Sequence, residues 1–560
     1  MTKAGFSKRW LWALLAAATA MCGCAPGQNQ VYDQTPAAAS VTKNHQAAAA
    51  SHDGKELVIG SPGTLPAFDP FGQSKQEARL NPLEFLAYRG LLAASEEKGY
   101  TAALAAGYTV ERENGKPSIV VKLREGGTWP DGSPITADDV LFTLETYARP
   151  EYYGVWRQAM GQIKGVSAYR SGQAEHISGI TVDTARKAVR IALERDDMRF
   201  FSTLTAPLLC RNQLAGKTVK EIGELSQAGR LLGAGPFQPM QLSPHEWRFA
   251  ANPAYCEGKP LLDAIRVRPV EPSGMAGELA GGTIDWCPVS PDMVSRLAGT
   301  ADAAGTLVAK AGGGSGYHFL GFNLESGPLA DLAVRRALAQ AISAGRISED
   351  VFYGYAEPAL GPVSPHSFAY APGGLPRYDR AGAAKTLAAK GFSAKNPLTL
   401  TLVYPAENGV RERLLRSLIR SWADLPVRIV TIPLPPKEFV SYIFGGKPFD
   451  LYLYGWRYPE DPGELSKLWH SREKVGELGL NASRYVNSRA DQLLERGRLI
   501  LPLSERKKLF AEWQRLFAAD LPIVPLVEVK QPYFVSSRLH LPDEQWGTQP
   551  FRTVHNWRLD

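Results

Sequence analysis

The sequence predicts a mixed α/β fold, because short apolar runs typical of strands alternate along the chain with capped segments of helical periodicity. Residues 57–59 are a short apolar run that ends at Gly60, and residues 118–123 read as another strand. A helix is predicted from Thr136, whose hydroxyl can cap the first turn while Asp139, three residues on, completes a capping box. The 560 residues include 44% hydrophobic and 21% charged residues, as in an ordinary globular chain of about three folding units.

Further helices and a late strand are expected in the second half of the chain. Asp331, Asp379 and Ser504 each precede apolar residues at helical spacing, which makes each of them a candidate N-cap. Residues 523–529 form an apolar run that reads as a buried strand, and Pro525 within it suits an edge or a bulge. Helices and strands are therefore mixed from about residue 56 onward.

The first residues have the pattern of an export signal. Three basic residues among the first nine precede an apolar run at 10–21, which is too short to span a bilayer. The run leads to Cys24, which follows a small residue as the acylated cysteine of a bacterial lipobox does. We therefore expect a lipoprotein signal peptide at 1–23, a flexible tether at 24–55, and an exported protein with a lipid anchor in a bacterial membrane. An ordinary cleaved signal peptide is the alternative, and it also exports the chain.

Charge and residue spacing give no indication of catalysis, metal binding or nucleic-acid binding. The net charge of +7 is weak and dispersed for a nucleic-acid partner. The nine histidines form no H-E-x-x-H pair and have no zinc-ligand spacing with the cysteines, and the sequence has neither a Walker loop nor a G-x-G-x-x-G motif after a strand. Export permits one disulfide among Cys210, Cys256 and Cys287. We therefore expect no enzyme activity, no catalytic residue, no cofactor and no metal.

A cluster of glycines near the middle of the chain is a candidate hinge. The glycines at 312–314 and at 316 precede an apolar strand expected at 317–322. Because glycine tolerates large changes of φ and ψ, Gly314 and Gly316 are candidate hinge residues. A plain surface turn is the alternative interpretation of the same residues.

Six segments, each weak alone, follow one another in an order that is specific. They are 121–144 (VKLREGGTWPDGSPITADDVLFTL), 233–263 (with GAGPF, NP and GKPLLD), 282–285 (GTID), 321–342 (with GFN, P, D and VRRAL), 378–391 (YD to G) and 449–456 (FD to GW). Together they resemble the family-5 extracellular solute-binding proteins, which are the oligopeptide-, dipeptide- and nickel-binding subunits of ABC importers. The resemblance extends from about residue 56 to the C-terminus.

The resemblance implies a two-lobed periplasmic-binding-protein fold of type II, in the large peptide-binding class. Lobe I is expected at 56–315, with a family-specific subdomain within about 75–230, and lobe II at 316–522. The C-terminal stretch 523–560 is expected to return to lobe I. Two crossover segments would join the lobes, near Gly316 and near Leu521, and the lobes would close around a ligand by hinge motion.

The resemblance also indicates where a ligand would bind. In peptide-binding relatives an aspartate shortly after a Gly-Trp pair meets the ammonium group of the ligand, whereas here Pro459 occupies that position. Glu460 or Asp461 can substitute for it, and Arg457 suits an anionic group instead. The expected ligand-binding residues are Trp456, Tyr454, Tyr458, Glu460, Asp461, Arg457, Ser61 and Gly63. For each of them, packing in a core or exposure in a solvated loop is the alternative.

The function implied by the resemblance is capture of oligopeptide-like ligands and their delivery to an ABC permease and ATPase complex. We expect a monomer with a small peptide or a similar solute as partner, tethered to the membrane by its lipid anchor, and no nucleic acid. Binding of a non-peptide solute, such as a metal chelate, a sugar or a peptidoglycan fragment, is the first alternative. An exported hydrolase on the same fold and a sensory receptor subunit are alternatives of other classes.

Overall fold

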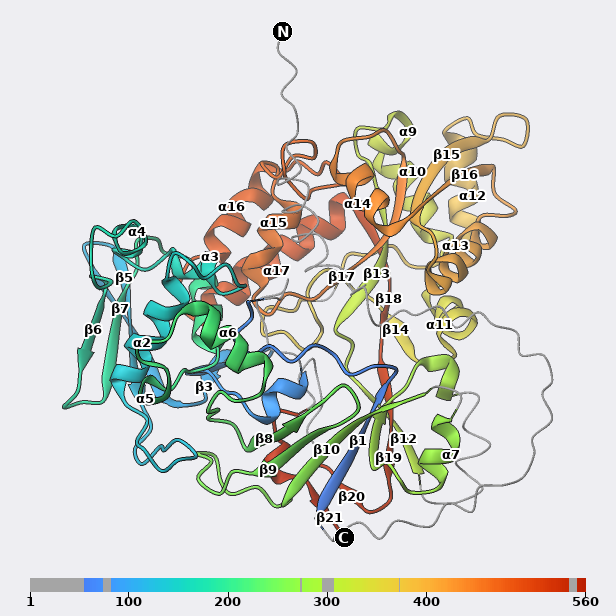
Figure 1. Cartoon of the computed structure of the whole chain (residues 1–560). Coiled ribbons are helices and arrows are strands. Elements are labelled where there is room, and N and C mark those ends of the chain that lie inside the picture. Colours follow the sequence, from blue (N-terminus) through green and yellow to red (C-terminus); the bar gives the residue numbers. More distant parts are fainter. Residues whose placement is uncertain (1–54, 74–81, 272–273, 295–306, 372, 543–550) are drawn as a thin grey trace. The chain divides into compact units, whose positions relative to one another are not determined.

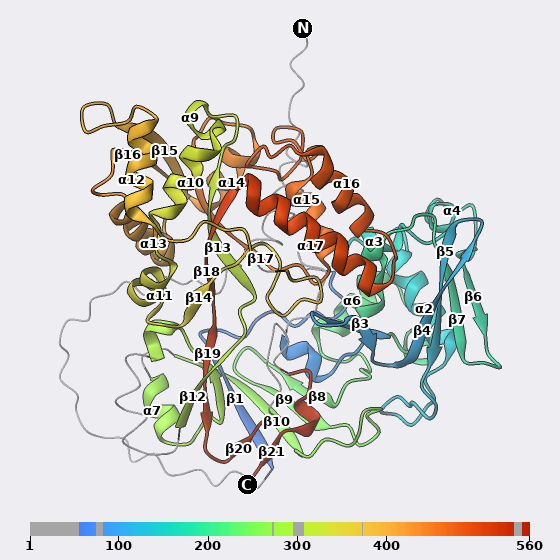
Figure 2. The ribbon, with the colours of Figure 1, turned by 180° about the vertical axis from the view of Figure 1, so that it is seen from behind.

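The computed structural model describes residues 55–73, 82–271, 274–294, 307–371, 373–542 and 551–560 (Figures 1 and 2). Within these residues the chain divides into two units. Unit 1 is Gly314–Lys530, and unit 2 combines the described residues up to Gly313 with Gln531–Asp560. The predicted signal peptide and the tether lie outside the described residues, apart from the tether's last residue.

Unit 2 is built on a seven-stranded sheet with the order β12-β19-β11-β1-β10-β9-β8. Its strands are β1 (Glu56–Pro62), β8 (Phe237–Leu242), β9 (Trp247–Ala251), β10 (Ala264–Val270), β11 (Trp286–Pro288), β12 (Leu307–Gly312) and β19 (Gln531–Ser536). The predicted strand at 57–59 is the centre of β1, which pairs in parallel with β10 and β11. Leu57, Val58 and Ile59 are fully buried, as the unbroken apolar run requires of a strand covered on both faces.

A separate four-stranded sheet of unit 2 has the order β4-β5-β7-β6 and lies within the range where the resemblance places a subdomain. Its strands are β4 (Ala105–Glu113), β5 (Lys116–Leu123), β6 (Ile180–Asp183) and β7 (Ala188–Ala192). The expected strand at 118–123 is most of β5. The predicted capping box also forms, because the Thr136 side chain accepts from the Asp139 N–H and the Asp139 carboxylate accepts from the Thr136 N–H, which starts α2 (Ala137–Ala148).

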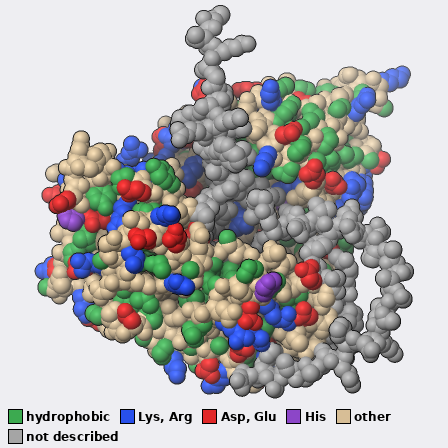
Figure 3. Space-filling view, in the orientation of Figure 1, with side chains coloured by type: hydrophobic (Ala, Val, Ile, Leu, Met, Phe, Trp, Pro, Cys, Tyr) green, Lys and Arg blue, Asp and Glu red, His purple; other side chains and the backbone are tan. Residues whose placement is uncertain are grey.

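The rest of unit 2 consists of short elements. They are η1 (Pro82–Leu86), β2 (Leu92–Ser95), β3 (Gly99–Ala102), α3 (Arg157–Met160), α4 (Val166–Arg170), η2 (Met198–Thr205), α5 (Arg211–Leu214), α6 (Val219–Gln227), α7 (Met275–Ala280), β20 (Leu539–His540), η4 (Val554–Asn556) and β21 (Arg558–Leu559). On the face of unit 2 drawn in Figure 3, basic side chains lie among acidic ones. Unit 2 also has ion pairs between such side chains, for example Arg112–Asp196 at 2.6 Å.

Asp285 fastens the beginning and the end of unit 2 to each other. The Asp285 carboxylate is fully buried and accepts from the Val58 N–H in β1 at 2.9 Å and from the Ser536 hydroxyl in β19 at 3.0 Å. Arg538 donates to both carboxylate oxygens, at 2.7 and 2.9 Å. The aspartate of the motif at 282–285 therefore has a structural role, since it joins strands that are far apart in the sequence.

Unit 1 is built on a six-stranded sheet with the order β14-β18-β13-β17-β15-β16. Its strands are β13 (Gly316–Phe322), β14 (Ala356–Pro358), β15 (Leu398–Pro405), β16 (Val427–Leu434), β17 (Leu451–Arg457) and β18 (Ile523–Val529). The predicted strand at 523–529 is β18, and the ladder shifts register opposite its Pro525, so the proline lies at a bulge. Because β18 pairs with β13 and β14, it belongs to unit 1, which differs from its expected place in the C-terminal stretch of lobe I.

Helices cover both faces of the unit 1 sheet. They are α9 (Gly327–Ala330), α10 (Leu332–Gln340), α11 (Ala344–Phe352), α12 (Arg380–Ala389), α13 (Gly409–Ser421), α14 (Pro436–Phe444), η3 (Pro462–Leu465), α15 (Ser466–Trp469), α16 (Ser488–Gly497) and α17 (Leu503–Asp520). Figures 1 and 2 show α15, α16 and α17 on one side of the strands and α10, α12 and α13 on the other. Along β17, Leu451 and Leu453 pack into one core, whereas Tyr452, Tyr454 and Trp456 pack into the opposite one.

Two of the three N-caps predicted in this half of the chain are confirmed. Asp331 accepts from the Ala333 N–H at 2.8 Å at the start of α10, and Asp379 accepts from the Gly382 N–H at 2.8 Å at the start of α12. The prediction for Ser504 is wrong. Helix α17 begins at Leu503 and its N-cap is Pro502, whose fixed φ leads directly into the helix, so Ser504 is inside the first turn.

Candidate functional site

Three buried side chains form a row across neighbouring strands at one end of the unit 1 sheet. Trp456 in β17 is the cross-strand partner of Tyr317 in β13, and Tyr317 is the partner of Glu528 in β18. Directly paired residues project from the same face of a sheet, so the three side chains are neighbours. Their exposed fractions are 2%, 3% and 6%. We call Trp456, Tyr317 and Glu528 the aromatic–acid row.

Glu528 connects the row to the two chain segments that flank it. One carboxylate oxygen accepts from the Gly314 N–H at 3.1 Å, and the other accepts from the Tyr458 hydroxyl at 3.0 Å. The Tyr458 ring stacks on the Tyr317 ring with centroids 5.2 Å apart and an interplanar angle of 25°. Burial, and then the charge of Glu528, raise the pKa of the Tyr370 phenol. A carboxylate with aromatic neighbours therefore lies beside the point where the chain enters unit 1.

The two candidate hinge glycines lie against this row. A Cβ atom at Gly314 would be 2.4 Å from Cγ of Glu528, and one at Gly316 would be 2.4 Å from the carbonyl oxygen of Trp456. Glycine is thus required here for close approach of the backbone to its neighbours. The hinge role of Gly314 and Gly316 stays a prediction.

The aromatic residues expected to line the ligand site pack within unit 1. The rings of Tyr454 and Trp456 meet edge to face with centroids 5.0 Å apart, and Trp456 also contacts Phe444. Tyr458 is buried as well, and its N–H donates to the Ser315 carbonyl at 3.0 Å. The structure therefore brings Trp456, Tyr454 and Tyr458 together, and their role in ligand binding stays a prediction.

Asp461 is engaged in a buried ion pair. Arg506 in α17 donates to both oxygens of the Asp461 carboxylate, at 2.5 and 2.8 Å, and the exposed fraction of each side chain is 1%. The same carboxylate caps η3 by accepting from the Gly463 N–H at 2.7 Å. Since a bidentate arginine already neutralises this carboxylate, Asp461 stabilises the loop after β17.

The remaining expected ligand-binding residues are divided between the two units. Glu460 and Arg457 are partly exposed and belong to unit 1 with the aromatic residues. Ser61 and Gly63 belong to unit 2, where Ser61 is in β1 and Gly63 follows it. The Gly63 N–H donates to the Val270 carbonyl at 3.0 Å, and its φ of +73° favours glycine.

Two charged residues beside the site were not among the predicted residues. Glu528 is an acid within the apolar run 523–529, and a charge inside a run that reads as a buried strand is the signal that could have identified it. Arg411 in α13 is fully buried and donates to the Tyr454 carbonyl at 2.7 Å and to Nδ1 of His318 at 2.6 Å. Burial, and then the charge of Arg411, hold the pKa of His318 well below its usual value, so this imidazole is neutral.

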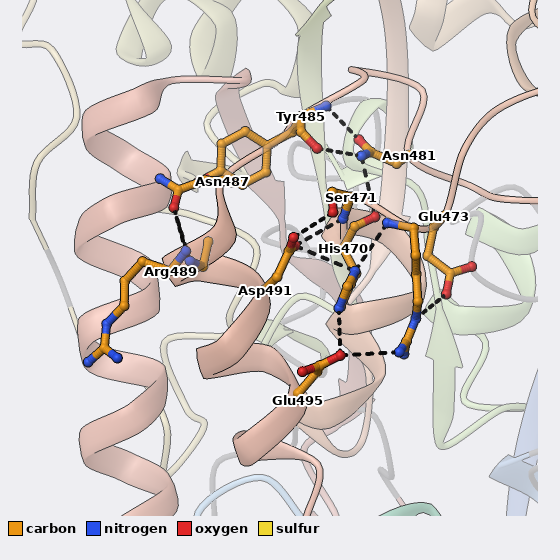
Figure 4. A network of polar contacts seen from close by, with 11 residues as sticks. His470, Ser471, Glu473, Asn481, Tyr485, Asn487, Arg489, Asp491 and Glu495 are labelled. Atoms are coloured by element: carbon orange, nitrogen blue, oxygen red, sulfur yellow. Dashed lines mark hydrogen bonds and ion pairs between the residues drawn. The ribbon is translucent and has the colours of Figure 1, made fainter.

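A polar network around His470 attaches the segment before α16 to that helix (Figure 4). The Arg472 N–H donates to Nδ1 of His470 at 3.1 Å. Because Nδ1 accepts this hydrogen bond, the contact of Nε2 with the Glu495 carboxylate, also at 3.1 Å, is one in which the imidazole donates. The Ser471 N–H donates to Asp491 at 2.9 Å. These contacts fix a loop on a helix and bring no nucleophile to the histidine.

Metal, thiol and membrane features add little to the site. Among the residues that the structure describes, no group of three or more His, Cys, Asp or Glu side chains has the arrangement to hold a metal ion. Cys210, Cys256 and Cys287 are free thiols, and burial raises the pKa of Cys287 to about 12. No helix formed by the described residues is both long enough and apolar enough to cross a membrane.

Comparison with known proteins identifies the family. The model of the bacterial extracellular solute-binding proteins, family 5, matches residues 92–475. The oligopeptide-binding protein AppA of Bacillus subtilis is 24% identical over 527 residues, which cover 90% of this chain and 91% of AppA. The structure of AppA with a bound nonapeptide has a TM-score of 0.63 at 22% identity and covers 90% of this chain and 99% of that one.

A second solved structure supports the same fold. The ABC transporter substrate-binding protein CtaP of Listeria monocytogenes has a TM-score of 0.73 at 20% identity, covering 91% of this chain and 100% of that one. The two-lobed α/β fold that the sequence predicted is confirmed by these neighbours. With a family model that matches most of its length, the chain belongs to the family-5 bacterial extracellular solute-binding proteins.

Proposed function

We propose that this chain is the extracytoplasmic substrate-binding protein of an ABC importer, and that it captures oligopeptide-like ligands by hinge closure and delivers them to a permease. The observation that carries this proposal is the similarity to oligopeptide-binding AppA along nearly the whole of both chains. Trp456, Tyr454 and Tyr458 belong to one cluster of unit 1, and aromatic rings are well suited to pack against a peptide. Trp456, Tyr454, Tyr458 and Arg457 in unit 1 are proposed ligand-binding residues, and so are Ser61 and Gly63 in unit 2.

The proposal includes attachment to the membrane through Cys24, with the preceding residues removed. The short apolar run and the small residue before Cys24 support this part. Expression of the full-length chain in a bacterium, followed by intact-mass analysis, is expected to show a mature protein that begins at Cys24 with acyl chains. In a Cys24→Ala variant the acyl mass should disappear and the protein should leave the membrane fraction.

Native mass spectrometry tests the binding role. The purified protein, stripped of bound molecules by unfolding and refolding, is mixed with synthetic peptides of graded length. We expect a ladder of peptide masses on the folded protein and recovery of every peptide intact, since the proposed protein binds without catalysis. A protein that binds no peptide of the set overturns the proposal, and loss of peptide in proportion to the protein overturns its non-enzymatic part.

A non-peptide solute is the second candidate ligand class. One observation favours it: Pro459 offers no carboxylate after the Gly-Trp pair, and the Asp461 carboxylate is already neutralised by Arg506. The solved structure of NikZ from Campylobacter jejuni, which has a TM-score of 0.66 to this chain, contains Ni(L-His). A single non-peptide mass retained by the protein as purified from its host would favour this candidate over oligopeptides.

A further inference from the structure

We propose that His470 is a pH-sensitive latch: when its imidazole takes up a proton, the loop that follows it loses a hydrogen bond to the ring, and the resulting movement reaches Trp456. We call residues 471–481 the latch loop. The inference is carried by the two alternative partners that the structure places at one nitrogen of this buried ring. It concerns the protein without a ligand and does not depend on the proposed function.

In its neutral form, His470 links the latch loop to α16. The Arg472 N–H donates to Nδ1 at 3.1 Å, and Nε2 donates to the Glu495 carboxylate at 3.1 Å (Figure 4). The Glu473 N–H also donates to the His470 carbonyl, at 3.0 Å. Only 8% of the His470 side chain is exposed, so the ring has little access to water. The first turn of the latch loop therefore depends on a lone pair at Nδ1.

Protonation of the ring is incompatible with this arrangement. A protonated imidazole donates at both nitrogens, so Nδ1 can no longer accept from the Arg472 N–H. The contact is partly buried, and an N–H left there without an acceptor is costly, so the loop moves until this group meets water or another acceptor. An Asp491 carboxylate oxygen, 3.5 Å from Nδ1, can receive the new N–H. The two protonation states therefore favour two positions of the latch loop, as in other histidine switches.

The charged groups around the ring come from α16 and from both sides of His470 in the sequence: Asp491, Glu495, Lys467, Arg472 and Glu473. The two acids of α16 lie within 3.5 Å of the ring nitrogens. The Arg472 guanidinium lies 3.4 Å from the Glu495 oxygen that the ring contacts, and 3.3 Å from Glu473. Lys467 in α15 pairs with an acid of η3 at 2.9 Å. A protonated ring thus has two carboxylates to pair with, and it shares one of them with a guanidinium.

The latch loop is attached to the surroundings of Trp456. The Gly476 N–H donates to the Phe444 carbonyl, at the end of α14, at 2.7 Å. The Phe444 ring contacts the Trp456 ring, with centroids 6.1 Å apart. Val475, beside Gly476, packs against the core cluster to which Trp456 belongs. A movement of the latch loop is therefore transmitted to Trp456 through the end of α14.

The other two histidines of unit 1 lack this arrangement. His318 is buried, and burial, followed by the charge of Arg411, holds its pKa well below the usual value, so it stays neutral near neutral pH. His366 is exposed. His366→Gln is therefore a matched control, because it removes an imidazole from the same unit and leaves the contacts of His470 in place.

The first experiment follows the ring itself. The protein, labelled with ¹⁵N in its histidines, is titrated from about pH 8 to about pH 5, and the NMR signals of His470 are identified by their absence in His470→Gln. At the upper pH we expect a proton on Nε2 and none on Nδ1, and at the lower pH a proton on each. A ring that keeps Nδ1 unprotonated throughout overturns the proposal, and so does a ring that carries both protons from the start.

The second experiment follows Trp456 over the same pH range. The tryptophans are replaced by 5-fluorotryptophan during expression, and the ¹⁹F signal of Trp456 is identified with Trp456→Phe. We expect this signal to shift with the same midpoint as the His470 ring. The shift should be lost in His470→Gln and retained in His366→Gln. A signal that does not shift, or that shifts equally in His470→Gln, overturns the proposal.

A third measurement needs no variant. Hydrogen exchange of the latch-loop amides in the unaltered protein is measured at about pH 8 and at about pH 5 and is divided by the intrinsic exchange rate at each pH. Loss of the Arg472 hydrogen bond should reduce protection of the latch loop about 10-fold at the lower pH, while the amides of β15 and β17 keep theirs. Equal protection of the latch loop at the two pH values overturns the proposal, even if His470→Gln fails to fold.

Discussion

Two buried acids of unit 1, Asp461 and Glu528, contact described partners of different kinds. Asp461 is held by a bidentate arginine, with both side chains 1% exposed. Glu528 accepts from the Tyr458 phenol and from the Gly314 N–H. The contrast teaches that burial of an acid does not by itself indicate its role. Asp461 fastens a loop to helix α17, whereas Glu528 connects strand β18 to the segments before β13 and after β17.

The largest loss of stability is expected when the ion pair between Asp461 and Arg506 is broken. Arg506→Ala leaves Asp461 buried without its arginine, and we expect the free energy of unfolding of unit 1 to fall by about 3–5 kcal/mol. Urea unfolding followed by tryptophan fluorescence measures this loss. The double variant Asp461→Leu with Arg506→Met is the control, because it removes both charges and should lose much less. A loss below about 1 kcal/mol in Arg506→Ala would mean that the pair is not the structural anchor described here.

Unit 2 offers a pair that sharpens the comparison, because its arginine is less buried. The Asp285 side chain is fully buried, whereas 29% of the Arg538 side chain is exposed. In Arg538→Ala the carboxylate retains the Val58 N–H and the Ser536 hydroxyl, so we expect a loss of about 2 kcal/mol in the free energy of unfolding of unit 2. Hydrogen exchange of β1 and β19 amides reports this loss separately from unit 1. A loss as large as that of Arg506→Ala would show that partial exposure of the cation does not weaken such a pair.

Arg411 and His318 differ from the ion pairs above, because here a buried cation donates to a neutral ring instead of to a carboxylate. The folded protein holds the pKa of His318 well below its usual value of 6.5, so as the pH falls the unfolded chain takes up this proton first. The stability that the neutral imidazole contributes is therefore present above about pH 6.5 and is lost as the pH falls below that value. Between about pH 7 and pH 5.5 we expect a loss of about 1 kcal/mol, measured by urea unfolding.

A variant at His318 isolates this contribution from the carboxylates that titrate at lower pH. His318→Gln retains an acceptor for Arg411 and does not titrate. Between the same two pH values, the stability loss of this variant should therefore be about 1 kcal/mol smaller than that of the unaltered protein. Identical pH profiles of the two proteins would contradict the depressed pKa of His318.

Elements whose formation depends on local chemistry were predictable from the sequence. The cap at Thr136 and the caps at Asp331 and Asp379 depend on residues two or three positions apart, and all three form. The failure at Ser504 is also local, because Pro502 starts the helix earlier. The strand at 523–529 was predictable as a strand, but its membership of unit 1 depends on pairing with β13, about 200 residues earlier in the sequence.

The site was predictable only in part, for the same reason. The Gly-Trp segment was found by its resemblance to a family, and the structure brings Trp456 and Tyr458 together there. The residues that neighbour Asp461 in the sequence do not indicate its pairing with Arg506, because the two residues are 45 positions apart. Glu528 joins the row only through its cross-strand pairing with Tyr317. Ion pairs and strand neighbours between distant segments are set by topology, which one sequence does not reveal.

The smallest loss of stability is expected when an ion pair that is much more exposed than Asp461–Arg506 is broken. Arg489 in α16 donates twice to one oxygen of Glu512 in α17, at 2.7 and 2.9 Å, but the two side chains are 52% and 38% exposed. Water solvates both partners after the pair is broken, so Arg489→Ala should reduce the free energy of unfolding of unit 1 by only about 0.5 kcal/mol. The measurement is the same urea unfolding used for Arg506→Ala, and a loss above about 2 kcal/mol would contradict it. Arg506 donates to both oxygens of its carboxylate and Arg489 to one oxygen only, so a large difference between the two variants would reflect burial together with contact geometry.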